Sequence, residues 1–179
     1  MVRKTAFLGH RHVYKEVEGR IKDAVEEQIA DGCKNFIMGT RGEFDGLALR
    51  TCRAAVKFHP QIKIEVVFTS YKQLSQTSDF GVQLYGDVET IVYDVENVHF
   101  KRRITESIKH MLDECDTLIC CIDKDAVSSS SKQFLRYAEK KGLKIINLYR
   151  KEDNPFYHMT KEEYENFVRE ILYGKSEGK

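Results

Sequence analysis

Short apolar runs alternate with longer amphipathic runs along nearly the whole sequence, and this alternation restricts the possible folds more than any other feature. Apolar runs with the length of buried strands occupy residues 4–9, 35–39, 63–69, 89–95, 117–122 and 143–149. Helices are predicted between them, over residues 14–31, 43–58, 100–115 and 130–141. Strands that alternate with helices pair in parallel through right-handed crossovers. The pattern predicts an α/β fold, a Rossmann-like three-layer α/β/α sandwich with a mostly parallel sheet of about six strands.

Glycine and proline mark the ends of the predicted helices. Gly32 and Gly142 directly follow two of them, at the position where a glycine most readily ends a helix. Pro60 stops the helix over residues 43–58. Residues 70–87 are rich in Ser, Thr, Gly and Asp without a clear period, so they are predicted to form a loop.

The end of the chain carries one more helix signal. The pattern Thr160-Lys161-Glu162-Glu163 is typical of a capping box and predicts a terminal helix over about residues 160–173. We expect that helix to bury its apolar face on the sheet or in a homodimer; the face consists of Tyr164, Phe167, Val168, Ile171 and Leu172. No repeat, linker or composition break divides the sequence, so residues 1–179 are expected to form a single domain.

Charge and composition argue against several classes of partner. The 29 basic and 28 acidic side chains give a net charge of +1, whereas a general nucleic-acid scaffold needs a basic excess. No apolar run approaches the ~20 residues needed to cross a bilayer, and the first residues lack a signal-peptide pattern. The five cysteines are odd in number and lie mostly in apolar contexts, which predicts reduced, buried thiols and a cytoplasmic protein. Cys120 and Cys121, adjacent on one strand, should face opposite sides of the sheet.

Two glycine-rich segments follow consecutive strands, at the edge where open parallel sheets bind ligands. The first strand is followed by Gly9, His10 and Arg11, and the second by residues 39–42, which are Gly39, Thr40, Arg41 and Gly42. Glycine lets backbone amides approach a ligand, arginine offers a planar fork of donors, and both segments lead into a helix N-terminus. One such segment alone would be read as a tight turn with a solvated arginine. Two at consecutive strand ends predict a shared site for a phosphate group.

Acidic and hydroxyl side chains near these turns have two interpretations each. Asp45 lies in the first turn of its helix, where a carboxylate opposes the helix dipole; alternatively, Asp45 or Glu43 accepts a hydrogen bond from a ribose hydroxyl. Ser129, Ser130 and Ser131 can cap the helix over 130–141, donate to phosphate oxygens, or form a plain surface loop. Histidines at positions 10 and 12 have no second ligand cluster at a suitable spacing, so no metal is expected.

These strand-end segments resemble the SLOG superfamily, whose Rossmann-like members include the DNA-processing A domain, the "lonely guy" phosphoribohydrolases and the YpsA-like branch. The YpsA-like branch is the most similar. The sequence FLGHR at 7–11 resembles its first strand end, GTRGEFD at 39–45 its second, and MLDECDTLI at 111–119 its helix before the penultimate strand. The resemblance covers residues 4–150 approximately, and it implies a nucleotide-type ligand and favours a homodimer.

The sequence departs from that family at four places. His12 stands where the family usually has proline, and Glu43 is inserted between Gly42 and Phe44. Residues 129–131 are serines where the family has a Gly-Gly-Thr phosphate loop. The glutamate that the phosphoribohydrolases keep after that loop is absent, because residues 132–134 are Lys, Gln and Phe.

The leading hypothesis is therefore a protein that senses or sequesters a nucleotide or nucleotide-derived small molecule at the strand ends, without a cofactor. One alternative is a nucleoside-phosphate N-glycosidase or phosphoribohydrolase, in which Glu43 or Asp45 supplies the acid–base group. The other is an accessory protein of nucleic-acid processing, against which the near-neutral charge argues. The missing glutamate favours binding over catalysis.

Overall fold

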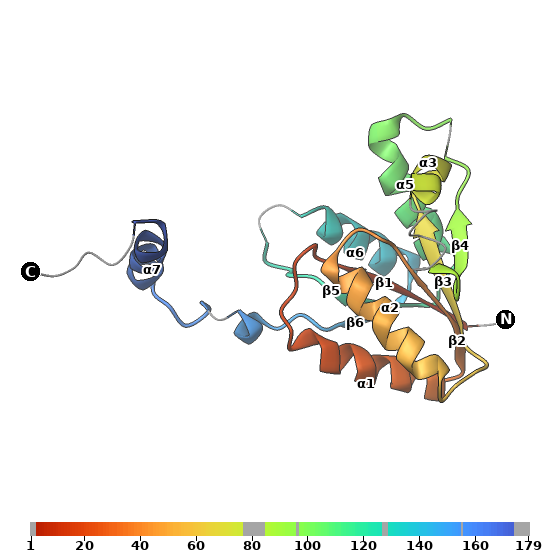
Figure 1. The fold of residues 1–179 in the computed structure, drawn as a ribbon, viewed down its shortest axis with the longest axis horizontal. Helices are drawn as coiled ribbons and strands as arrows, with labels where there is room; N and C mark the ends of the chain where they lie inside the picture. Colours follow the sequence, from red (N-terminus) through yellow and green to blue (C-terminus); the bar gives the residue numbers. More distant parts are fainter. Residues whose placement is uncertain (1–2, 77–84, 96, 127–128, 155, 174–179) are drawn as a thin grey trace, which may run out of the picture. The chain divides into compact units, whose positions relative to one another are not determined.

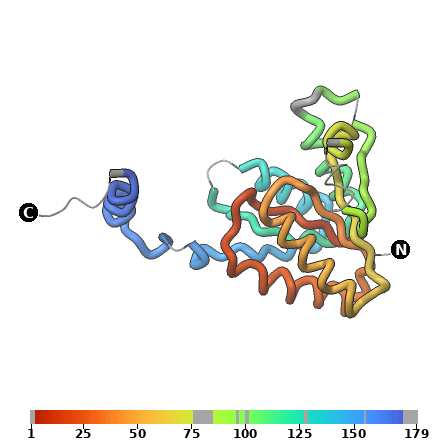
Figure 2. The backbone as a smooth tube through the Cα atoms, in the orientation of Figure 1, coloured from red at the N-terminus to blue at the C-terminus, as the bar shows by residue number. Residues whose placement is uncertain are grey.

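The computed structural model describes residues 3–76, 85–95, 97–126, 129–154 and 156–173. The backbone divides into two compact units, Met1–Tyr149 and Arg150–Lys179. The first unit contains the sheet and the second contains the terminal helix, as the backbone tube in Figure 2 shows. In the described residues no helix is long and apolar enough to cross a membrane.

The first unit is built on a six-stranded parallel sheet with the strand order β4-β3-β2-β1-β5-β6 (Figure 1). Its strands are β1 (Arg3–Gly9), β2 (Cys33–Met38), β3 (Lys63–Phe68), β4 (Glu89–Val92), β5 (Thr117–Cys121) and β6 (Lys144–Asn147). Its helices include α1 (Val17–Ala30), α2 (Glu43–Val56), α3 (Tyr71–Gln76), α5 (Phe100–Asp113) and α6 (Ser130–Lys141). The predicted Rossmann-like α/β fold is confirmed.

Helices cover both faces of the sheet, because its central strands are apolar on both sides. One core packs α1 and α2 on the sheet through residues such as Ile21 and Phe44, and the other packs α5 and α6 through residues such as Leu112 and Leu135 (Figure 1). Every residue of β5 is buried. Cys121 belongs to the first core and Cys120 to the second, which confirms their opposite orientations, and all five cysteines are buried and form no disulfide.

Most predicted element ends agree with the structure. Gly32 and Gly142 adopt φ angles of +86° and +80°, so both use the left-handed conformation that only glycine adopts readily. The predicted helix over 130–141 coincides with α6. The edge strands β4 and β6 are shorter than predicted, ending at residues 92 and 147.

The prediction of a loop over residues 70–87 is wrong at its start, where α3 forms. Polar side chains begin this short helix: Ser70 Oγ accepts a hydrogen bond from the Gln73 amide at 3.1 Å. In return, Gln73 Oε1 accepts from the Thr69 amide and hydroxyl at 3.0 and 2.8 Å. Six residues are too few to show a helical period, so the sequence pattern misses α3. Residues 77–84 of the predicted loop lie outside the described residues.

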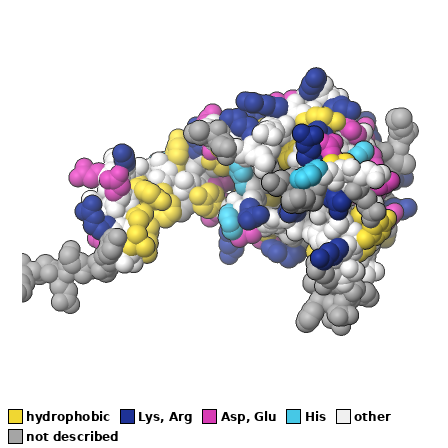
Figure 3. Space-filling model, turned by 90° about the horizontal axis from the view of Figure 1, so that it is seen from above, with side chains coloured by type: hydrophobic (Ala, Val, Ile, Leu, Met, Phe, Trp, Pro, Cys, Tyr) yellow, Lys and Arg dark blue, Asp and Glu magenta, His cyan; other side chains and the backbone are white. Residues whose placement is uncertain are grey.

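The second unit contains a short 3₁₀ turn, η1 (Lys151–Asp153), and the helix α7 (Lys161–Tyr173). The predicted capping box is confirmed: Glu163 Oε2 accepts from the Thr160 amide at 2.7 Å, and Thr160 Oγ1 accepts from the Glu163 amide at 3.3 Å. Within this unit Tyr164, Ile171 and Leu172 remain 46%, 66% and 66% exposed. Burial of this face on the sheet or in a homodimer stays a prediction. Figure 3 shows hydrophobic side chains gathered on this unit.

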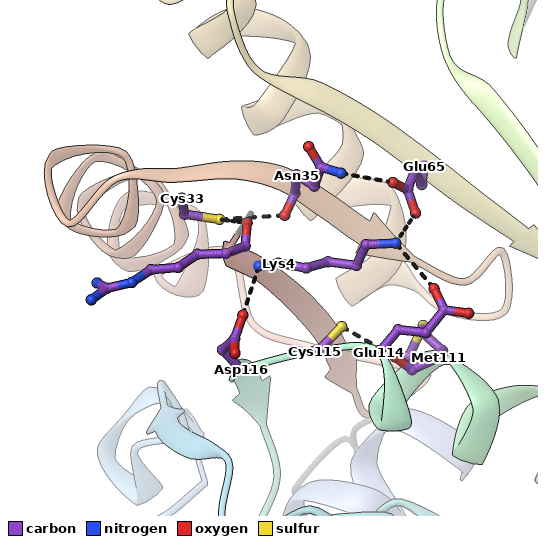
Figure 4. Close-up of polar contacts among 9 residues, drawn as sticks. Lys4, Cys33, Asn35, Glu65, Met111, Glu114, Cys115 and Asp116 are labelled. Atoms are coloured by element: carbon purple, nitrogen blue, oxygen red, sulfur yellow. Dashed lines mark hydrogen bonds and ion pairs between the residues drawn. The ribbon is translucent and has the colours of Figure 1, made fainter. Parts of the chain in front are cut away.

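A charged cluster lies at the edge of the sheet where the strands begin (Figure 4). Lys4 Nζ is 2.7 Å from Glu65 Oε2 and 3.0 Å from Glu114 Oε2. Asn35 Nδ2 donates to the other Glu65 oxygen at 3.2 Å, and Asp116 Oδ2 accepts from the Lys4 amide at 3.0 Å. This cluster joins β1, β2 and β3 to the segment that precedes β5.

Candidate ligand-binding site

A cavity of about 380 Å³ opens at the carboxyl ends of β1, β2 and β3 and is also lined by α5 and the start of α6. The chain runs outward from β1 to β4 and then returns to the other side of β1 as β5. The cavity therefore lies by the point where strand order reverses, which is where open parallel sheets bind ligands. Eight residues predicted to bind a ligand line it: Gly9, Arg11, Gly39, Arg41, Gly42, Asp45, Ser130 and Ser131.

Two glycines allow the segments after β1 and β2 to approach each other. A Cβ atom on Gly42 would lie 3.0 Å from Arg11 Cα and 3.2 Å from the His10 carbonyl oxygen. A Cβ atom on Gly9 would lie 2.4 Å from Cγ of Phe44, the second residue of α2. The Glu43 amide then donates to the Arg11 carbonyl at 2.9 Å, which joins the two segments directly. Because the backbones touch, the arginines that follow β1 and β2 enter the same cavity.

Arg11 and Arg41 give the cavity a positive rim. Both line it, and in the part of the chain that the structure describes neither guanidinium group makes a hydrogen bond or a salt bridge. Burial and the neighbouring charge of Arg11 lower the pKa of Arg41, and the charge of Asp45 partly offsets this effect. Arginine nevertheless stays protonated in proteins. Two guanidinium groups that repel each other across one cavity leave their donors available to an anion.

Two helix N-termini add to the positive potential of the rim. The helix α2 begins directly after Gly42, and α6 begins after Ser129, which makes no side-chain capping hydrogen bond. Ser130 and Ser131 line the cavity, and Ser131 Oγ donates to the Gly9 carbonyl at 3.3 Å. That contact holds the start of α6 against the end of β1. Helix N-termini favour anions through their unpaired amides and the helix dipole.

Asp45 is built into the turn that carries Arg41. Its Oδ2 atom accepts a hydrogen bond from the Arg41 amide at 2.9 Å. Burial raises the pKa of Asp45 to about 6, against the opposing effects of the Arg41 and Gly42 amides and the Arg41 charge. Asp45 thus stabilises the start of α2. Because Asp45 also lines the cavity, the interpretation that it accepts a hydrogen bond from a ribose hydroxyl of the ligand stays a prediction.

Glu43, the other candidate acid–base residue, is not among the residues that line the cavity. Its Oε2 atom accepts from the Val13 amide at 3.1 Å, and its Oε1 atom lies 3.3 Å from His12 Nδ1. The Val13 amide and the His12 side chain lower the pKa of this exposed carboxyl group. The Glu43 side chain therefore stabilises the conformation of residues 12 and 13. This arrangement does not support an acid–base role for Glu43.

Three further residues that were predicted to bind a ligand do not line the cavity: His10, Thr40 and Ser129. His10 Nε2 accepts from the Asp123 amide at 2.8 Å, and the His10 amide donates to the Cys121 carbonyl at 3.1 Å. Burial lowers the pKa of His10 more than the charge of Asp123 raises it, so the imidazole is neutral near pH 7. Thr40 Oγ1 accepts from Gln73 Nε2 at 3.1 Å. These contacts attach the two glycine segments to β5 and to α3.

The wall that α5 contributes was not predicted from the sequence. Ile104, Thr105, Ser107, Ile108 and Met111 line the cavity, together with Leu8, Val67 and Phe134. The apolar members fit the core-facing stripe of a helix, so periodicity assigns them to the core. The one available signal is that Ser107 interrupts this stripe three residues after Ile104.

Asp45 is the only acidic side chain among the described residues that line the cavity. Among the described residues no group of three His, Cys, Asp or Glu side chains could hold a metal ion. Comparison with protein-family models and with curated proteins finds no match for this chain. The fold and the site together define an α/β protein with a cationic cavity at the switch point of a Rossmann-like sheet.

Proposed function

We propose that the protein binds a phosphate-bearing small molecule, a nucleotide or nucleotide-derived compound, in this cavity. The observation that carries the proposal is the presence of two guanidinium groups, Arg11 and Arg41, that have no partner among the described residues and lie on one rim beside two helix N-termini. The volume of about 380 Å³ suits a small organic ligand, since such sites measure roughly 300–1,000 Å³. Membership of the SLOG superfamily is part of this proposal and is supported by the placement of both glycine segments.

Binding without turnover is the form of the proposal that the geometry supports. Cleavage of an N-glycosidic bond requires a carboxylate near the sugar carbon that becomes positively charged. Among the described residues that line the cavity, Asp45 is the only acidic one, and its Oδ2 atom is already bonded to the Arg41 amide. We therefore propose ligand sensing or sequestering rather than hydrolysis.

The proposal also covers the cellular compartment and the partners of the protein. Five buried cysteines that form no disulfide suit a reducing, cytoplasmic compartment. On the face shown in Figure 3, Lys and Arg side chains are interspersed with Asp and Glu, which does not favour a nucleic-acid partner. A homodimer remains a prediction.

We expect Arg11→Ala and Arg41→Ala each to weaken nucleotide binding about tenfold or more, because a charge-assisted hydrogen bond contributes about 1.5–3 kcal/mol. Calorimetric titration of the purified protein with nucleoside 5′-monophosphates and ADP-ribose measures this. The matched control is Arg136→Ala, which removes an exposed arginine of α6 that does not line the cavity. Unchanged affinity in both cavity variants would contradict the anion site. Chromatographic detection of released base, abolished by Asp45→Asn, would favour the hydrolase instead.

The variant Asp45→Asn separates the two interpretations of Asp45. If Asp45 only holds the turn, its charge at pH 7.5 opposes a bound phosphate, and its protonation below about pH 6 relieves that opposition. We therefore expect Asp45→Asn to tighten ADP-ribose binding at pH 7.5 by up to about tenfold, or 1.4 kcal/mol. The wild-type protein should gain affinity between pH 7.5 and pH 5 relative to the variant. Weaker binding by the variant at both pH values would assign Asp45 to a sugar hydroxyl.

A further inference from the structure

The cavity has two chemically different halves. Its rim carries Arg11, Arg41 and the starts of α2 and α6, whereas its inner wall is formed largely by apolar side chains of α5, including Ile104, Ile108 and Met111. A bare inorganic anion would use only the rim. Apolar surface in the inner half instead fits a ligand with an uncharged, weakly hydrated body attached to its phosphate.

One polar group on the apolar wall has no partner in the described part of the chain. Ser107 is 1% exposed, it lines the cavity, and its Oγ atom makes no hydrogen bond within the described residues. A buried hydroxyl group in a helix ordinarily bonds to the carbonyl one turn earlier, and leaving it unsatisfied destabilises the protein. Structures tolerate such groups mainly where a ligand or an ordered water satisfies them.

We propose that Ser107 is the specificity-determining contact for the nucleobase of the bound nucleotide. This inference rests on the proposed function, since the phosphate at Arg11 and Arg41 fixes which end of the ligand enters the inner half. The planar base lies against the apolar wall of α5, and its polar edge exchanges a hydrogen bond with Ser107 Oγ. A heterocyclic base fits because it combines apolar faces with a hydrogen-bonding edge, whereas an aliphatic chain would leave the hydroxyl group unsatisfied.

The proposal predicts opposite effects of Ser107→Ala on stability and on binding. Without ligand, the variant should be at least as thermally stable as the wild-type protein, because it removes an unsatisfied buried polar group. Its affinity for the best-bound nucleoside 5′-monophosphate should fall about tenfold, whereas its affinity for ribose 5-phosphate should not change. A purely structural hydroxyl group would show the reverse pattern of lost stability and retained binding.

The experiment titrates wild-type, Ser107→Ala and Thr5→Val proteins with AMP, GMP, CMP, UMP and ribose 5-phosphate. Thr5 is the matched control: it is 1% exposed, it lies outside the cavity lining, and its Oγ1 atom is 3.2 Å from Cys33 Sγ. Thr5→Val should lower the melting temperature and leave every affinity unchanged.

The possible failures are distinguishable. If Arg11→Ala weakens nucleotide binding but Ser107→Ala does not, the hydroxyl group is satisfied by solvent, and this inference is wrong while the proposed function stands. A wild-type protein that binds ribose 5-phosphate as tightly as every nucleotide also overturns it. If neither ribose 5-phosphate nor any nucleotide binds, the proposed function fails first, and the inference fails with it.

Discussion

Replacing Lys4 with methionine is expected to lower the free energy of unfolding by about 3–5 kcal/mol, the usual cost of leaving one member of a buried ion pair unpaired. The side chains of Lys4 and Glu65 are only 17% and 6% exposed, and their charged atoms are 2.7 Å apart. Without Lys4, the Glu65 carboxylate would keep only the hydrogen bond from Asn35 among its described partners. Urea unfolding at pH 7 measures the loss.

Two further variants test whether the loss comes from the buried charge. Lys4→Met combined with Glu65→Leu should recover most of the stability, because an apolar pair of similar volume often replaces a buried ion pair without loss. Lys144→Met removes an exposed lysine that pairs with Glu27 and Asp31, and should cost at most about 1 kcal/mol. If Lys4→Met costs no more than Lys144→Met, the cluster is not a buried ion pair in energetic terms.

The pH dependence of this effect has a defined sign. Burial lowers the pKa of Lys4, but hydrogen bonds and charges from Glu65 and Glu114 outweigh burial and raise it above 10.5. A lysine whose pKa is raised in the folded state stabilises the protein fully below its unfolded pKa, and this stability is lost as the pH rises through the folded pKa. The difference between wild-type and Lys4→Met proteins should therefore be constant near neutral pH and shrink only above pH 10.5.

The fold followed from local sequence patterns, whereas contacts between distant positions did not. Alternation of apolar and amphipathic runs is repeated over the whole chain, so it predicted all six described strands and their parallel pairing. The cluster around Lys4 joins positions 4, 65 and 114, which meet only through the register of the sheet from β1 across β2 to β3 and through the residue that follows α5. No local pattern specifies that register.

Some residues of the candidate site could likewise be predicted from local sequence patterns, whereas others could not. The rule that parallel sheets bind ligands at their carboxyl edge selects Arg11 and Arg41 from the strand ends alone, and both residues line one cavity in the structure. It does not say which side chains near a strand end turn outward. His10 and Glu43 make contacts with Asp123 and Val13 instead, which depend on the detailed path of the loops. The residues of α5 that line the cavity were not predicted, because the apolar face of a helix has the same sequence period beside a cavity as in a core.

Substituting alanine for Gly9 is expected to destabilise the protein by at least about 1–3 kcal/mol, as overpacking of a tight core does. The added Cβ atom would lie 2.4–2.6 Å from three atoms of the Phe44 side chain, whose exposure is 0%. Relief requires the start of α2 to move, and Arg41 and Asp45 are attached to that start. Nucleotide affinity should therefore fall together with stability.

The cause of this loss can be isolated by removing the side chain that clashes. Gly9 does not adopt a positive φ angle, so alanine at this position carries no backbone strain. In a Phe44→Ala background, which itself costs about 3–5 kcal/mol, Gly9→Ala should become neutral or stabilising by about 0.4–1 kcal/mol, because alanine restricts the unfolded chain. The control is Gly46→Ala in α2, the helix that also contains Phe44. The new Cβ atom at position 46 would have no atom within 4 Å, so this substitution should stabilise α2. Equal effects of Gly9→Ala in both backgrounds would mean that Phe44 is not what excludes a side chain at position 9. The convergence of the two arginine-bearing turns would then need another explanation.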